Sequence, residues 1–348
     1  MIDAPAPPPP APVAWELFLA GAHGPEQTVR YAQAAERAGL AGVWLAEHHF
    51  ISYGQTPSAT TLAAYLLGRT ERIAVGTAAC VLSNRHPVAL GEEAALIDAI
   101  APGRFRLGVA RGGPWVDLEV FGTGLDRYRH GFAEALDLLR QWLSGAAGVG
   151  AGGERFSFRE VAVVPRPVRP VPIWVAATSP STVDLAAGRG LPLLLGVQDD
   201  LPAKAATLRR YAETAAAAGH DPLRVPHASV HLAYLGDRAR LRPGLAAWLA
   251  TTREYVRVDG AAPARDLTGY ADRLLRIHPV GGGPERLAEL AAGVAALGVR
   301  HLLLMVEAAG PGAETEHQIA AVAVAAAAAR VDHGATARHA GRHADESP

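Results

Sequence analysis

Residues 73–110, IAVGTAACVLSNRHPVALGEEAALIDAIAPGRFRLGVA, contain the pattern that recurs along most of the chain. A short run of β-branched and small apolar residues, 73–78, is followed by a segment with helical spacing, 87–100, and then by a second apolar run, 105–110. Short apolar runs separated by a helical segment are typical of parallel strands joined by a crossover helix. This stretch therefore predicts one β–α–β unit of a parallel sheet.

The same alternation extends in both directions from this unit. Further strands are expected at 15–20, 42–46, 172–177, 192–196, 228–235 and 301–306. Further helices are expected at 25–38, 57–69, 129–143, 180–189, 202–218, 284–297 and 314–331. Several helices begin with Pro and end at Gly, as the backbone chemistry of helix ends favours. Eight strands are enough to close a barrel, so the predicted fold is α/β, a single (β/α)8 TIM barrel over residues 13–333.

The competing architecture is an open, doubly wound sheet with a dinucleotide site. Such a sheet needs a G-x-G-x-x-G turn after its first strand. The stretch Ala20-Gly21-Ala22-His23-Gly24 has a different spacing, so the barrel is the preferred prediction.

Two connections are too long to be simple links between a strand and a helix. One covers 111–169 and includes a glycine-rich linker at 144–154, and the other covers about 236–280. Active sites of barrels lie at the carboxyl ends of the strands, so we expect both as insertions at the C-terminal face, the second forming a lid. The Pro-rich residues 1–12 and the polar residues 334–348 are expected as disordered tails.

Composition and charge argue against several classes of partner. The formal net charge of the 348 residues is -1 and the basic residues are scattered, so neither nucleic acid nor a membrane surface is expected as a partner. The only cysteine is Cys80, which excludes an internal disulfide and multi-cysteine zinc sites, and no metal site is expected. No secretory signal is visible, and the alanine-rich stretch 320–329 is too short to span a bilayer. We therefore expect a soluble, cytoplasmic protein.

A histidine pair follows the second predicted strand, within Glu47-His48-His49-Phe50. Successive residues of a strand face opposite sides, so only one of the two histidines is expected to point into the barrel mouth. That histidine is a candidate general base, because imidazole titrates near neutral pH, and the other is expected to be structural. Hydrogen-bonding histidines without a catalytic role are the alternative interpretation.

Arginines and hydroxyl groups follow the fourth and fifth predicted strands. Arg111 stands after a strand and before two glycines, and Arg129 is expected at the start of the next helix. The stretch Thr178-Ser179-Pro180-Ser181-Thr182 opens another helix, with Ser179 as its N-cap. Each feature alone is explained by a surface arginine or a plain helix cap. Together on one barrel face they predict a site for a phosphate-bearing cofactor, because guanidinium groups and helix N-termini both bind phosphate.

The sequence resembles the bacterial-luciferase-like flavin monooxygenases, and the likeness is close to the luciferase alpha subunit over roughly residues 15–331. No single motif is decisive, but the ordered set is highly specific. The motifs are Val43-Trp44-Leu45-Ala46-Glu47-His48-His49-Phe50, Leu66-Leu67-Gly68-Arg69-Thr70-Glu71, His86-Pro87-Val88, Pro102-Gly103-Arg104-Phe105-Arg106-Leu107-Gly108, Arg111-Gly112, Val120-Phe121-Gly122, Gly190-Leu191-Pro192, Gly219-His220-Asp221 and His278-Pro279-Val280-Gly281.

The resemblance implies an FMN barrel with the isoalloxazine ring at the carboxyl ends of the strands. In the family, two arginines after the fourth strand bind the FMN phosphate, and they match Arg111 and Arg129. A serine and a threonine that open the next barrel helix do the same, and they match Ser179 and Thr182. The histidine that acts as a base near the flavin matches His48.

Three further cofactor positions follow from the same resemblance. A cis peptide under the isoalloxazine maps onto Ala78-Ala79. Ala110 stands where the luciferase alpha subunit has a reactive cysteine beside the flavin, and Thr178 stands where it has a glutamate. The family's oxygen chemistry does not in general need that cysteine, so oxygenation is still expected, whereas light emission and an aliphatic aldehyde substrate are not implied.

The expected function is that of a two-component monooxygenase. A separate flavin reductase supplies FMNH2, dioxygen adds at the flavin C4a to give a hydroperoxide, and one oxygen atom passes to a small organic substrate. The lid has no charge cluster and contains Trp248 and Tyr255, which favours an apolar or aromatic substrate. A composition rich in Ala, Arg and Gly is typical of high-GC genomes, where such enzymes often tailor natural products. A homodimer is expected from the family.

Two alternatives from other classes remain open. An F420-dependent oxidoreductase on the same barrel would move hydride and use no oxygen. A non-catalytic flavin-binding protein would need neither His48 nor a lid. A barrel of unrelated chemistry is a third possibility, because fold alone does not fix function.

Overall fold

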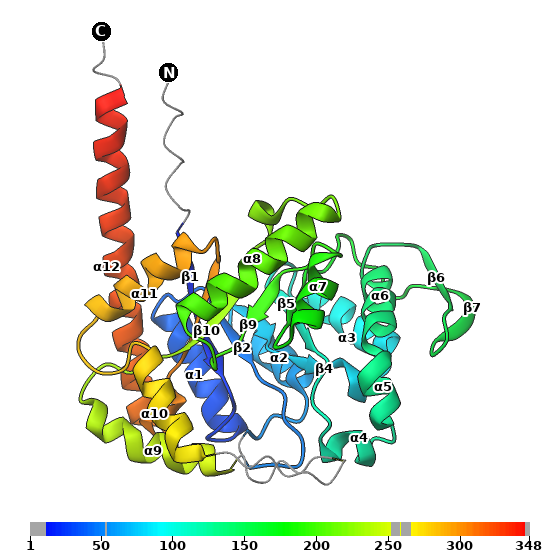
Figure 1. The fold of residues 1–348 in the computed structure, drawn as a ribbon, viewed down its shortest axis with the longest axis horizontal. Coiled ribbons are helices and arrows are strands. Elements are labelled where there is room, and N and C mark those ends of the chain that lie inside the picture. Colours follow the sequence, from blue (N-terminus) through cyan, green and yellow to red (C-terminus); the bar gives the residue numbers. More distant parts are fainter. Residues whose placement is uncertain (1–11, 53, 252–257, 259–265, 345–348) are drawn as a thin grey trace.

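The computed structural model describes residues 12–52, 54–251, 258 and 266–344, and within them eight parallel strands close into a barrel (Figure 1). The barrel strands are β1 (Ala14–Leu19), β2 (Gly42–Leu45), β3 (Ala74–Thr77), β5 (Phe105–Ala110), β8 (Ile173–Ala176), β9 (Leu193–Leu195), β10 (Ala228–Leu232) and β11 (His301–Met305). They pair in the order β3-β2-β1-β11-β10-β9-β8-β5, and the pairing of β3 with β5 completes the ring. Each predicted strand overlaps one of these, so the predicted (β/α)8 barrel is confirmed.

Helices cover the outside of the barrel, as Figure 1 shows. The outer helices are α1 (Pro25–Arg37), α2 (Ala59–Arg69), α3 (Pro87–Ile100), α6 (Phe132–Trp142), α7 (Pro180–Ala187), α8 (Leu201–Ala217), α11 (Glu285–Ala296) and α12 (Ala313–Ala344). Proline is the first residue of α1, α3 and α7, as the sequence predicts. Gly39 and Gly298, which follow α1 and α11, each have a φ of 78°, a left-handed conformation that ends a helix and favours glycine.

Side chains fill the barrel interior. Trp44, Trp174, Leu194 and Leu303 come from four different strands and pack in one buried cluster. The rings of Trp44 and Trp174 meet edge to face, with centroids 5.3 Å apart. Gly76 on β3 makes room for this pair, because a Cβ there would lie 2.4 Å from the Trp44 ring. The barrel is therefore a packed core with no open channel at this level.

A buried ion network lies near the amino ends of the strands. The Glu16 carboxylate accepts hydrogen bonds from Trp44 Nε1 and Arg106 Nη1, each at 2.5 Å, and lies 3.3 Å from His301 Nδ1. Burial alone raises the pKa of Glu16, but His301 and Arg106 outweigh burial and hold that pKa below its usual value. Because this end of a barrel seldom carries chemistry, we interpret the network as structural.

The first insertion differs from its prediction in two places. The predicted helix 129–143 is interrupted at Gly131, which ends α5 (Gly124–His130) and precedes α6. The predicted linker 144–154 contains β6 (Gly148–Gly152), which pairs antiparallel with β7 (Ser157–Ala162). The glycine-rich β6 forms a strand because it pairs with β7, whose residues favour strands more strongly. The composition of β6 alone does not reveal this tertiary contact. The short helix α4 (Val116–Val120) precedes α5.

The expected C-terminal tail needs a correction. Helix α12 continues to Ala344, so residues 334–344 are helical where we expected disorder. Alanine and arginine favour a helix in this stretch, whereas Gly334 and Gly341 do not, so helix propensity alone does not explain the extension beyond residue 331. The expected N-terminal tail falls outside the described residues except for residue 12, and so do residues 345–348.

The second insertion contributes α9 (Arg238–Ala250) and α10 (Leu267–Ile277). Both pack against Ala20, Leu232 and Met305, which lie at or just beyond the carboxyl ends of β1, β10 and β11. Figure 1 shows α4, α9 and α10 at the same end of the molecule. Val258 N also donates to Pro114 O at 2.7 Å, so the two insertions meet. Both insertions therefore lie at the C-terminal face, and none of the helices within the described ranges is long and apolar enough to cross a bilayer.

Candidate active site

A cavity of about 220 Å³ opens at the carboxyl ends of the barrel strands. Its wall combines residues from β1, from the ends of β2, β3, β5 and β8, and from the first insertion. The lining residues are Phe18, Ala46, Glu47, His48, His49, Ala78, Ala79, Val81, Ala110, Gly112, Trp115, Asp117 and Ala176. The cavity therefore lies where barrel enzymes place their active sites.

Glu47 fixes one side of the cavity. Its side chain is buried and accepts hydrogen bonds from Ala59 N at 3.1 Å and Val81 N at 2.9 Å. His49 Nε2 and Arg85 Nη2 each lie 3.6 Å from the carboxylate. Burial raises the pKa of Glu47, but His49, Arg85 and the two amides outweigh it, and the net pKa is lowered. Glu47 is thus an ionised group that holds β2, α2 and the residues after β3 together.

Both histidines of the pair line the cavity, which corrects the expectation that only one does. Strand β2 ends at Leu45, so the alternation of faces no longer applies to residues 46–49. His48 N donates to Thr56 O at 3.0 Å, and Gly54 packs so closely that a Cβ there would lie 2.5 Å from His48 Nδ1. Burial lowers the pKa of His48 to about 4, so its imidazole is neutral at neutral pH. His49 Nε2 lies beside the Glu47 carboxylate, and its structural role stays a prediction.

Small residues form the wall at the ends of β3 and β5. The Ala78–Ala79 peptide bond is cis, as expected from the resemblance. Ala78, Ala79 and Ala110 all line the cavity. Their methyl groups leave the backbone accessible, so a flat ring can approach this wall closely.

Three of the predicted phosphate ligands lie together. Arg111 Nη2 donates to Thr182 Oγ1 at 3.1 Å, and Thr182 Oγ1 lies 3.0 Å from Ser179 Oγ. Ser179 is the N-cap of α7, as predicted, and accepts a hydrogen bond from Thr182 N. Arg111 also lies over the rings of Tyr128 and Phe132, at 5.9 and 5.6 Å from their centroids. This Arg111–Ser179–Thr182 cluster adjoins the cavity, because Ala110 and Gly112 are both lining residues.

Two predicted cofactor residues lie differently from expectation. Arg129 is exposed in the last turn of α5 and does not begin a helix. A cation is favoured there by the helix dipole, so its position requires no bound anion. Thr178 is exposed and is not among the residues that line the cavity. Their contact with a cofactor stays a prediction from the resemblance.

The structure adds site residues that the sequence pattern did not single out. Trp115 and Asp117 reach the cavity from the first insertion, and Asp117 is buried. Next to His49 of the cavity wall, the His49 and Phe121 rings are 5.1 Å apart and the Phe50 and Phe121 rings 5.7 Å apart. Phe50 and Phe121 are 54% and 45% exposed, so they form an exposed aromatic pair beside His49. Local sequence gives no signal for these contacts, which join separate segments.

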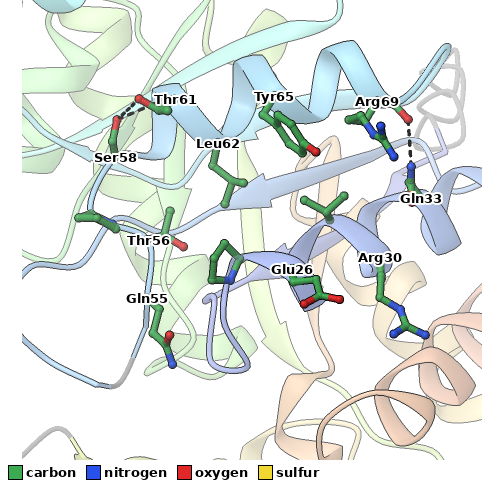
Figure 2. A pocket seen from close by; sticks show the side chains of 13 residues that line it. Glu26, Arg30, Gln33, Gln55, Thr56, Ser58, Thr61, Leu62, Tyr65 and Arg69 are labelled. Atoms are coloured by element: carbon green, nitrogen blue, oxygen red, sulfur yellow. Dashed lines mark hydrogen bonds between the residues drawn. The ribbon is translucent and has the colours of Figure 1, made fainter.

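A larger cavity, about 690 Å³, lies outside the barrel between α1 and α2 (Figure 2). Glu26, Arg30 and Arg69 line it together with Leu62 and Tyr65, and the Arg69 guanidinium carbon lies 6.0 Å from the centroid of the Tyr65 ring (Figure 2). None of the predicted cofactor residues lines it. In the described part of the chain, no group of three or more His, Cys, Asp or Glu side chains is arranged to hold a metal ion.

Known proteins share the family and the fold of this chain. The model of the luciferase-like monooxygenase family matches residues 13–301, and the chain belongs to this family. It is 37% identical over 201 residues to the alkanal monooxygenase alpha chain of Photorhabdus luminescens, covering 57% of this chain and 55% of the relative. The alpha chain of Photobacterium leiognathi is 30% identical over 315 residues, covering 82% of this chain and 87% of the relative. In most of the alpha-chain matches, the aligned part spans only about half of the relative's length.

Solved structures share the barrel. The monooxygenase RslO1 from Streptomyces bottropensis is 25% identical, with a TM-score of 0.74 over 89% of this chain and 98% of its own. An F420-dependent secondary alcohol dehydrogenase is 18% identical, with a TM-score of 0.73 over 85% of this chain and 93% of its own. The second likeness shows the fold alone.

Proposed function

We propose that the chain is a flavin-dependent monooxygenase that binds reduced FMN in the strand-end cavity. The observation that carries this proposal is the Arg111–Ser179–Thr182 cluster beside a wall of alanines. Arg111 Nε is buried and has no hydrogen-bond partner among the described residues, so it is free to donate to an anion. A phosphate group fits this donor set, because it accepts several charged and hydroxyl hydrogen bonds at once. The flavin ring would then lie toward Ala78, Ala79 and Ala110.

Reduced flavin, when bound, supplies the electrons that activate dioxygen for transfer of one oxygen atom to an organic substrate. The protein's own part is to bind, orient and exclude water. We assign to His48 the movement of protons at its imidazole nitrogen. Its lowered pKa keeps it neutral at rest, and a negative charge arriving in the cavity would raise that pKa and let it accept a proton.

The substrate we propose is a small apolar or aromatic compound of the natural-product type. The exposed rings of Phe50 and Phe121, which contact each other beside His49 of the cavity wall, favour it, because exposed aromatic faces bind planar apolar groups. Trp248 packs against the buried cluster that α9 and α10 form with Ala20, Leu232 and Met305, whereas Tyr255 lies outside the described residues. We further propose that a separate cytoplasmic reductase supplies the reduced flavin.

We also propose a homodimer that uses the outer face of α2 and α3. Tyr65 on α2 and Leu96 and Ile100 on α3 are 54%, 53% and 68% exposed. Exposed apolar side chains on adjacent helices are typical of an association surface. Sedimentation of the chain and of a Leu96→Glu, Ile100→Glu variant tests this. A dimer that the variant dissociates supports the proposal, and a monomeric unaltered chain contradicts it.

The experiment for the cofactor is an anaerobic titration of the full chain with FMNH2 and, separately, with reduced F420. Preferential binding of FMNH2, weakened in an Arg111→Ala variant, is the expected result. Preferential binding of reduced F420 would move the function to hydride transfer. The F420 alternative stays open, because F420-dependent enzymes share this barrel.

A further inference from the structure

Asp117 is a buried acid on the wall of the active-site cavity. It lies in the first turn of α4, is 3% exposed and lines the cavity beside Trp115. Its Oδ2 accepts a hydrogen bond from Asn84 Nδ2 at 2.5 Å. Its Oδ1 is buried and has no hydrogen-bond partner within the described ranges.

An acid of this kind needs an explanation, because buried polar atoms nearly always have a partner. The dipole of α4 favours an acid in its first turn, but Glu119 on the same helix has that benefit while remaining exposed. Helix chemistry therefore does not account for the burial of Asp117. Carboxylate oxygens accept hydrogen bonds, so the group that would pair with Oδ1 is a donor.

We propose that Asp117 determines substrate specificity by accepting a hydrogen bond from an O–H or N–H group on the organic substrate. This inference rests on the proposed function, since it assigns substrate binding to the part of the cavity wall that the proposed flavin ring does not contact. The strand ends contribute alanine methyls, which suit the face of a cofactor ring. Asp117 and Trp115 come instead from the insertion, where Pro114 meets Val258 of the second insertion. Insertion loops are the part of a barrel that varies with the substrate.

The substrate class follows from the two neighbours. Trp115 offers an aromatic face and Asp117 an acceptor oxygen, so the cavity selects a compact aromatic or apolar molecule with one donor, such as a phenol or an aryl amine. Sites built to bind a donor discriminate strongly against analogues that lack it, because the buried acceptor is then left unpaired.

The test compares phenol with anisole, which has the same ring and no donor. Their affinities are measured by calorimetry for the FMN-loaded full chain and for Asp117→Asn, Asp117→Ala and Glu119→Gln variants. Glu119→Gln is the matched control, since it removes an exposed acid from the same helix. We expect the unaltered chain and the control to prefer phenol by about tenfold or more. The preference should shrink toward equal affinity in both Asp117 variants, with unchanged thermal unfolding in at least one.

Several results would overturn the assignment. They are equal affinity of the unaltered chain for both probes, no binding of phenol, or an undiminished preference for phenol in the Asp117 variants. A loss of FMN affinity with the phenol preference intact would also overturn it and assign Asp117 to the flavin. Failure of the proposed function is separate: it appears as absent FMNH2 binding in the unaltered chain, whatever the phenol-to-anisole ratio.

Discussion

Replacing Arg111 with Ala should weaken binding of reduced FMN without unfolding the barrel. The substitution removes the Nη2 group that donates to Thr182 and the Nε group that has no partner among the described residues. A hydrogen bond to a charged group contributes about 1.5–3 kcal/mol. Since about 1.4 kcal/mol corresponds to a tenfold change in Kd, the expected loss is roughly 10- to 140-fold.

The assay is an anaerobic fluorescence titration with FMNH2, with thermal unfolding of each variant as the check on folding. Arg224→Ala is the control, because the Arg224 side chain is 88% exposed and Arg224 is not one of the predicted cofactor residues. This variant should bind FMNH2 as tightly as the unaltered chain. Arg129→Ala should cause a smaller loss than Arg111→Ala, since solvent screens an exposed charge. Unchanged affinity in the Arg111 variant would refute the phosphate assignment.

Three further predictions concern catalysis and stability. His48→Ala should lower product formation by about 10²–10⁴-fold, as for loss of a proton-transfer group, with FMNH2 affinity retained; unchanged turnover would refute the proton-transfer role of His48. Glu16→Gln should lower the free energy of unfolding, measured by chemical denaturation, by about 3–5 kcal/mol, because Arg106 loses its buried, ionised partner. A negligible change in that free energy would contradict the stabilising role of the ion network around Glu16. Burial lowers the pKa of both His227 and His278 to about 4, below an unfolded value near 6.5. The unfolded state therefore binds protons first, and the free energy of unfolding should fall as pH drops from about 6.5 to 4, by up to roughly 3 kcal/mol per group; a flat profile contradicts this.

The sequence predicts the barrel because each strand and helix carries its own local signal. Strand 105–110 and the helix from Pro87 to Ile100 are recovered within a residue of their observed bounds. Predictions fail where a distant contact decides the outcome. The strand β6 is glycine-rich and forms only because β7 pairs with it.

The residues of the candidate site also fall into two groups: those that the local sequence predicts and those that only the fold brings to the cavity. Ser179 is recognised as a helix cap from its own segment, and its contact with Thr182 follows. Asp117 lies in a short helix without a distinctive motif, and only the fold brings it to the cavity. The two histidines both face the cavity because the strand stops before them, a boundary that alternation does not reveal.

The central claim, that bound reduced flavin reacts with oxygen inside the cavity, is tested most directly by rapid mixing. The chain loaded anaerobically with FMNH2 is mixed with oxygenated buffer while the absorbance spectrum is recorded. The account predicts a transient species with one near-ultraviolet band before the spectrum of oxidised FMN appears. Direct conversion to oxidised FMN, at the rate of free FMNH2, would contradict it.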